Sequence, residues 1–155
     1  MKTLKFTIEI FAQPEKVWKA LWDKQHYTQW TKPFTEGCYY ETEAFTEGSK
    51  INFLSPNGDG MISKIAVLQP GEYVAFEHLG MVYQGKESSF KTADDTHQYL
   101  ETYRLTANEN ATTLTVEVDT LEPWEERMNT SFPKALQIVK EISEKYFAWR
   151  DGFKE

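Results

Sequence analysis

Two titratable residues, His78 and Glu101, are the first candidates for chemistry, because side-chain alternation places both on covered strand faces. In the stretch 96–106, Leu105 faces inward, and Glu101 falls on the same face. A buried carboxylate requires a hydrogen-bond partner or a wet cavity, and His78 shares an inward face with Phe76 on the preceding strand. Contact between the two would allow acid and base chemistry, so they are the candidate catalytic pair. A structural hydrogen bond, or exposure of Glu101 at the strand end, is the simpler explanation.

Other reactive residues do not assemble a second site. His26 and His97 lack metal-ligand spacing, and Cys38 is the only cysteine, so no metal site is expected. The stretch 57–60, NGDG, has some character of a calcium loop, but a hairpin turn explains it. Ser63 faces inward without a convincing base beside it, so we expect no nucleophilic role for it. A glycine-rich phosphate loop and a GxSxG elbow are absent from the sequence, and no cofactor is expected.

Length and charge exclude several classes of protein. The chain has 155 residues, and its 17 Lys and Arg against 24 Asp and Glu give a formal net charge of −7, which disfavours nucleic-acid binding. A single cysteine excludes a disulfide scaffold and favours a cytoplasmic location. The sequence contains no apolar run long enough for a membrane span. Residues 1–155 are expected to form one domain, unusually rich in aromatic residues.

The elements that would position these residues follow from hydrophobic periodicity. Residues 3–11 alternate as a half-buried strand, and Pro14 then begins an amphipathic helix over 14–23. A short second helix is predicted over 26–30. The final helix is expected from near Pro123 or Trp124 to near Trp149, with a bend close to Pro133. Between the helices lie six predicted strands, over 38–45, 50–55, 61–69, 73–79, 96–106 and 111–119.

An antiparallel sheet of this size has one face that another element must cover, and the final helix offers the widest apolar surface. The predicted fold class is therefore α+β, with a curved sheet of about seven strands wrapped around a long C-terminal helix. A bend at Pro133 would let the helix follow the curvature of the sheet. A cavity can form where the helix and the sheet do not pack closely. The irregular stretch 80–95 is interpreted as a mobile flap over that cavity, or as a functionless disordered segment.

A family resemblance agrees with this pattern. The stretches HYTQWTKPF, GCYYETEAFTEGSKINFLSPNGDGMISKI, FEHLG, LETYRLT, TTLTVEVDT and FPKALQIVKEI resemble the bacterial branch of the family named after the activator of heat-shock protein 90 ATPase. That family lies in the START-like, or SRPBCC, superfamily, so the resemblance implies a single helix-grip domain. Superfamily members include lipid carriers, hormone receptors and polyketide cyclases. The eukaryotic activators carry a further chaperone-binding domain, for which 155 residues are expected to leave no room.

Three functions are compatible with the sequence. The first is binding of an apolar or amphipathic small molecule, lipid-like or polyketide-like, between the sheet and the C-terminal helix. The second is a cyclase or hydrolase-like enzyme that uses His78 and Glu101. The third is a co-chaperone or other protein-interaction module that acts through the outer face of the sheet. The predicted cavity lining consists of Tyr40, Phe53, Met61, Ile65, Phe76, His78, Tyr99, Glu101, Tyr103, Leu136 and Val139.

Overall fold

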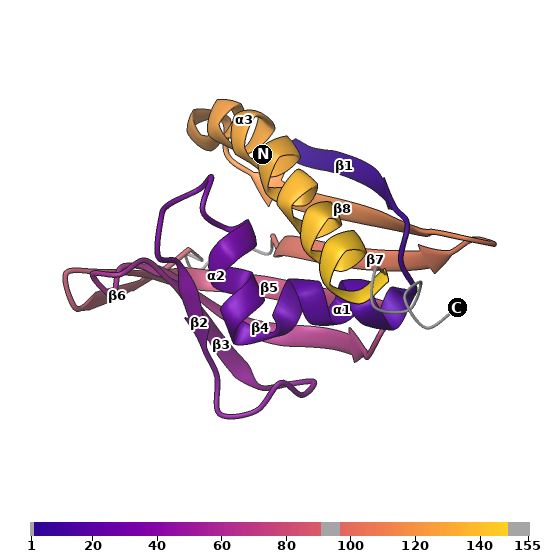
Figure 1. Cartoon of the computed structure of the whole chain (residues 1–155). Helices are drawn as coiled ribbons and strands as arrows, with labels where there is room; N and C mark the ends of the chain where they lie inside the picture. The colour runs from indigo at the N-terminus through magenta and orange to yellow at the C-terminus, as the bar shows by residue number, and fades with distance from the viewer. Residues whose placement is uncertain (1, 91–96, 149–155) are drawn as a thin grey trace.

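The computed structural model describes residues 2–90 and 97–148, with the backbone alone for 146–148. Within these residues, three α-helices and eight strands follow one another, and Figure 1 shows the helices together on one side of the sheet. The elements are β1 (Lys2–Ile10), α1 (Pro14–Trp22), α2 (Lys24–Trp30), β2 (Tyr39–Glu41), β3 (Lys50–Leu54), β4 (Gly60–Gln69), β5 (Tyr73–Tyr83), β6 (Lys86–Ser89), β7 (Tyr99–Ala107), β8 (Thr112–Thr120), α3 (Glu122–Ile142) and a π-helical extension, η1 (Ser143–Ala148).

The sheet is antiparallel throughout, with the strand order β1-β8-β7-β5-β4-β3-β2. The first and last strands of the chain therefore pair, and α3 follows β8 directly and packs back over β1 (Figure 1). This is the helix-grip arrangement, and the predicted α+β fold class is confirmed. The sheet presents one face to all three helices.

Helices α1 and α3 begin close to their predicted positions. Pro14 occupies the first turn of α1, where its missing N–H costs no intrahelical hydrogen bond. Pro133 lies inside α3, and buried residues stand on both sides of it, among them Phe132 and Leu136. The bend expected at Pro133 stays a prediction. Trp149, the predicted end of the final helix, lies outside the described residues.

The stretch 80–95 differs from the prediction. Residues 80–83 extend β5, and β6 pairs back onto them through a turn in which Gln84 and Gly85 both have positive φ. Gly80 permits this pairing, because a Cβ there would lie 2.1 Å from the carbonyl oxygen of Ser88. The prediction of an irregular stretch is therefore wrong over residues 80–89, which form strands and a turn. Residues 91–96 lie outside the described part of the chain. This hairpin also raises the strand count from about seven to eight.

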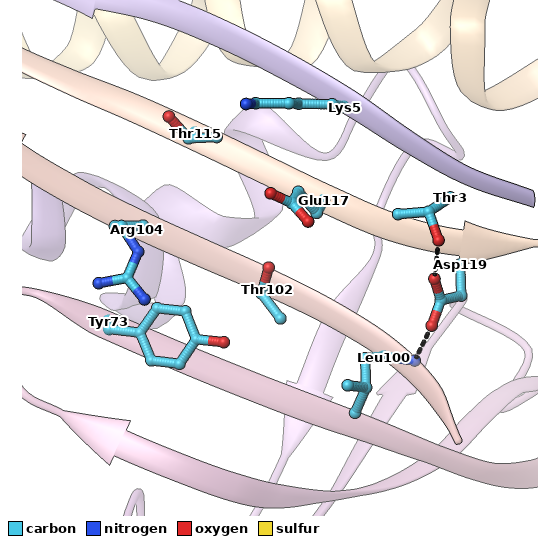
Figure 2. A pocket seen from close by; sticks show the side chains of 9 residues that line it. All are labelled: Thr3, Lys5, Tyr73, Leu100, Thr102, Arg104, Thr115, Glu117 and Asp119. Atoms are coloured by element: carbon cyan, nitrogen blue, oxygen red, sulfur yellow. Dashed lines mark hydrogen bonds between the residues drawn. The ribbon is translucent and has the colours of Figure 1, made fainter. Parts of the chain in front are cut away.

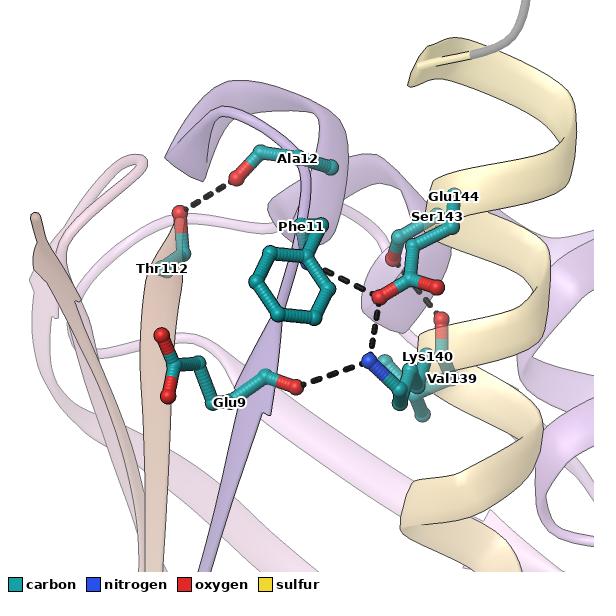
Figure 3. Close-up of polar contacts among 8 residues, drawn as sticks. All are labelled: Glu9, Phe11, Ala12, Thr112, Val139, Lys140, Ser143 and Glu144. Atoms are coloured by element: carbon teal, nitrogen blue, oxygen red, sulfur yellow. Dashed lines mark hydrogen bonds and ion pairs between the residues drawn. The ribbon is translucent and has the colours of Figure 1, made fainter. Parts of the chain in front are cut away.

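The C-terminal end of α3 is fastened to the corner between β1 and α1 (Figure 3). Lys140 Nζ lies over the ring of Phe11, 4.4 Å from its centroid, and donates to the backbone oxygen of Glu9 at 3.1 Å. Glu144 accepts from Lys140 at 2.5 Å and from the backbone N–H of Phe11 at 2.8 Å. These contacts satisfy backbone groups at the free edge of β1, which would otherwise be open to pairing with another strand.

Candidate functional site on the covered face of the sheet

Four polar side chains form a continuous hydrogen-bonded line on the covered face of the sheet. Ser63 Oγ lies 2.6 Å from His78 Nδ1, and His78 Nε2 lies 2.9 Å from Glu101 Oε1. The hydroxyl of Tyr103 donates to the other carboxylate oxygen of Glu101. We call this set, Ser63, His78, Glu101 and Tyr103, the polar line. The predicted contact between His78 and Glu101 is present in the structure.

Three neighbouring strands position the polar line. Glu101 and Tyr103 are two residues apart on β7 and therefore point to the same face. His78 lies on β5, next to β7, and Ser63 lies on β4, next to β5. The register between β4 and β5 shifts after Ile62, so that Ser63 is paired with His78 directly. The expectation that no base lies beside Ser63 is therefore wrong.

Burial differs sharply along the polar line. Ser63 is 0% exposed, Tyr103 is 1% and His78 is 3%, whereas 22% of the Glu101 side chain is exposed. Burial raises the pKa of Glu101, but the hydrogen bond and charge of His78 and the Tyr103 hydrogen bond oppose it, and the net result is a lowered pKa. Burial, followed by the charge of Glu101, raises the pKa of Tyr103 well above its usual value. Tyr103 is therefore a neutral donor to an ionised Glu101.

Aromatic rings from the helices and the sheet surround the inner part of the polar line. The Trp22 ring, at the end of α1, has its centroid 4.9 Å from that of Tyr103 and 5.2 Å from that of Phe76. Phe53 lies 5.0 Å from Phe76 and 6.1 Å from the ring of His78. The Trp22 indole N–H is buried, and the described residues give it no hydrogen-bond partner. A donor of this kind inside an apolar cluster is costly unless something accepts from it.

The structure distributes the other predicted lining residues around this cluster. Tyr40 is buried, and its hydroxyl donates to the backbone oxygen of Trp22. Ile65 is fully buried, whereas Met61 is partly exposed beside Phe53 on the neighbouring strand. Tyr99 is half-buried, and its ring contacts that of Phe90.

The two lining residues predicted on α3, Leu136 and Val139, are buried members of the same hydrophobic core cluster. The sequence reasoning left out Trp22 and Tyr27, although Trp22 makes ring contacts with six other aromatic residues. The apolar spacing of α1 indicated that Trp22 faces inward, and this signal was sufficient to find it.

A separate groove lies on the opposite face of the sheet, on which none of the described helices packs (Figure 2). Its residues alternate with the inward-facing ones along β1, β7 and β8, and its volume is about 510 Å³. The Arg104 guanidinium lies over the ring of Tyr73 at 4.2 Å, while Asp119 accepts from the Thr3 hydroxyl and the Leu100 N–H. The full lining is Thr3, Lys5, Tyr73, Leu100, Thr102, Arg104, Thr115, Glu117 and Asp119.

Within residues 2–90 and 97–148, no group of three or more His, Cys, Asp and Glu side chains is arranged to hold a metal ion. The helices in the same ranges are all too short or too polar to cross a membrane.

Solved structures with this fold include several bacterial proteins. MLL2253 from Mesorhizobium loti is 17% identical, with a TM-score of 0.69 over 93% of this chain and 98% of that one. The Aha1 dimer from Colwellia psychrerythraea gives 21% identity and a TM-score of 0.66, covering 93% and 97%. DynU16, from the dynemicin biosynthetic locus, gives 17% identity and a TM-score of 0.67, covering 93% of this chain but 48% of that one.

Among curated proteins, none matches the chain in sequence. The family model described as Activator of Hsp90 ATPase homolog 1-like protein matches residues 12–144, which include the polar line and all of α3. This chain is therefore a member of the Activator of Hsp90 ATPase homolog 1-like family, with the helix-grip fold.

Proposed function

We propose that the protein binds an apolar small molecule, lipid-like or polyketide-like, between the covered face of the sheet and α3. One observation carries the proposal: an apolar, aromatic region contains a line of four hydrogen-bonded polar side chains, one of which, the carboxylate of Glu101, is partly exposed. Small-molecule sites are built in this way, with apolar walls and a few polar groups that fix orientation. A cytoplasmic location belongs to the same proposal and rests on the single cysteine, Cys38.

Two further features support binding. The buried, unpartnered indole N–H of Trp22 can donate to a ligand acceptor. The neighbour DynU16 comes from a locus for dynemicin biosynthesis, which supports a small-molecule role for this fold. Tyr40, Phe53, Phe76, Tyr103, Leu136 and Val139 would supply the apolar walls, and Met61, Ile65 and Tyr99 would extend them.

The test is titration with N-phenyl-1-naphthylamine, a neutral fluorescent probe for apolar sites, on the parent protein and on Leu136→Trp. If Leu136 borders the binding site, the larger indole occupies the space of the probe, and binding is lost with little change in stability. If Leu136 packs in a filled core, the indole overpacks it and destabilises the protein by about 1 to 3 kcal/mol. An absence of probe binding to the parent protein contradicts the proposal. Native mass spectrometry of protein from its own host then identifies any ligand that co-purifies.

A hydrolase-like enzyme is the second candidate, and the 2.6 Å contact between Ser63 Oγ and His78 Nδ1 specifically favours it. A serine beside a histidine that a carboxylate orients is the arrangement of an activated nucleophile. A fluorophosphonate probe would label Ser63 in that case, and His78→Ala would abolish the labelling. Unlabelled Ser63 supports binding without chemistry, which is consistent with its complete burial.

A protein partner, including a chaperone, would bind the outer face of the sheet instead. The groove around Arg104 and Asp119 is the place for such contacts. Arg104→Glu would then abolish complex formation with the partner while it leaves probe binding intact.

A further inference from the structure

The charge and hydrogen bonding of Glu101 restrict the kind of molecule that the covered face accepts. Resting on the function proposed above, we propose that the ligand has a head group that donates a hydrogen bond, such as an alcohol, a phenol or an ammonium group. Carboxylate and phosphate amphiphiles are rejected. The head group binds Glu101, the partly exposed member of the polar line.

The first step of the argument concerns the free acceptor sites of Glu101. An ionised carboxylate offers about four lone-pair positions. His78 and Tyr103 donate to one oxygen each, which leaves acceptor capacity on both oxygens. The Glu101 side chain remains 22% exposed, while its two partners are almost completely buried. Glu101 is therefore the member of the polar line that an incoming molecule can reach.

The second step concerns charge. Among the described residues, no lysine or arginine forms an ion pair with Glu101, and His78 is its one basic partner. The Glu101 carboxylate is ionised and can only accept hydrogen bonds, and it lies in a region of low dielectric constant. An anionic head group placed there is repelled, and it has no hydrogen to offer to the carboxylate. A hydroxyl or ammonium group donates to the carboxylate and forms a strong, charge-assisted hydrogen bond.

The third step concerns Trp22. Its unpartnered indole N–H belongs to the ring that packs against Tyr103, and the Tyr103 hydroxyl donates to Glu101. A hydroxyl group has both a hydrogen for Glu101 and lone pairs for an indole N–H. An ammonium group satisfies the carboxylate alone. Among the donor-bearing head groups, an alcohol or phenol therefore matches more of the unused hydrogen-bonding capacity.

The test compares three competitors that have the same ten-carbon chain and different head groups: decanol, decylammonium and decanoate. Each displaces N-phenyl-1-naphthylamine from the parent protein, and the midpoints give their relative affinities. We expect decanol and decylammonium to bind at least about tenfold more tightly than decanoate, because a hydrogen bond to a charged group is gained and a like-charge contact is avoided. Equal or tighter binding of decanoate overturns the proposal, as does failure of all three to displace the probe.

Glu101→Gln and Glu117→Gln form a matched pair of variants. Both remove one negative charge, but Glu117 lies in the groove on the outer face. We expect Glu101→Gln to reduce the preference for decanol over decanoate by about tenfold, and Glu117→Gln to leave it unchanged. Equal effects of the two variants would show that the overall charge of the protein causes the preference, which would overturn the assignment to Glu101. Probe binding to the parent protein tests the proposed function separately from this preference.

Discussion

The hydroxyl of Ser63 lies 2.6 Å from Nδ1 of His78, on the side of the imidazole ring opposite to Glu101. Both nitrogens of His78 thus have partners, and the ring is held in one orientation although it is buried among apolar side chains. Polar groups in such surroundings stabilise a protein only when every member is paired. This relationship makes the stability of the fold depend on residues that also define the candidate site.

Ser63→Ala is expected to lower the free energy of unfolding by about 1 to 3 kcal/mol. The substitution leaves Nδ1 of His78 buried without a partner, and the cost of an unpaired buried polar atom falls in that range. Chemical denaturation at neutral pH measures the change. Ser88→Ala, on the exposed strand β6, is the control and should change stability by less than about 0.5 kcal/mol. Equal effects of the two substitutions would show that the Ser63–His78 hydrogen bond contributes little.

The pH dependence of stability tests the state of Glu101. Burial opposes ionisation of Glu101, but His78 and Tyr103 favour it more strongly, and its pKa in the folded protein lies below the usual 4.5. The resulting stabilisation is fully present above pH 4.5 and is lost as the pH falls through the lower, folded pKa. Between pH 7 and pH 3, the parent protein should therefore lose more stability than Glu101→Gln. Denaturation curves across this window measure the difference, and parallel losses would contradict it.

The sequence predicted the elements whose side chains are strongly patterned. The alternation of Leu4, Phe6 and Ile8 identified β1, and the apolar stripe through Ala135 and Val139 identified α3, because burial on one face determines both patterns. Strand β6 was missed because all four of its side chains are exposed and it is held only by backbone pairing with β5. A strand of this kind has no periodic signal to detect.

In the candidate site, His78 and Glu101 could be predicted from side-chain alternation, but the contact with Ser63 could not. Glu101 was found because a carboxylate on a covered face is unusual, and His78 followed as its partner on the adjacent strand. The contact with Ser63 depends on the shift of register between β4 and β5, which brings His78 opposite Ser63. Alternation determines which face a side chain occupies but not how far one strand slides along the next. The order of residues in the polar line could therefore not be predicted from the sequence.

Lys140→Met should destabilise the protein by about 1 kcal/mol and loosen the end of α3. Lys140 and Glu144 are both partly buried, at 22% and 29% side-chain exposure, and they hold the corner between β1 and α1 together (Figure 3). Faster hydrogen exchange at the Phe11 amide would accompany the loss, because that N–H donates to Glu144. Lys134→Met, at an exposed position of the same helix, is the control. Unchanged exchange at Phe11 would show that the corner is held by its apolar contacts alone.

Val139→Asp and Gln137→Asp place the same charge on opposite sides of α3, two residues apart. Val139 is 0% exposed within the core cluster, whereas Gln137 faces outward. An unpaired buried carboxylate costs several kcal/mol against a total stability of roughly 5 to 15 kcal/mol. Val139→Asp should therefore unfold the protein or nearly so, and Gln137→Asp should retain the parent circular dichroism spectrum and melting behaviour. Because both variants gain the same charge on the same helix, the difference between them measures burial. A folded Val139→Asp variant would mean that water reaches this side of α3, and the packing between sheet and helix would have to be far more open than the structure shows.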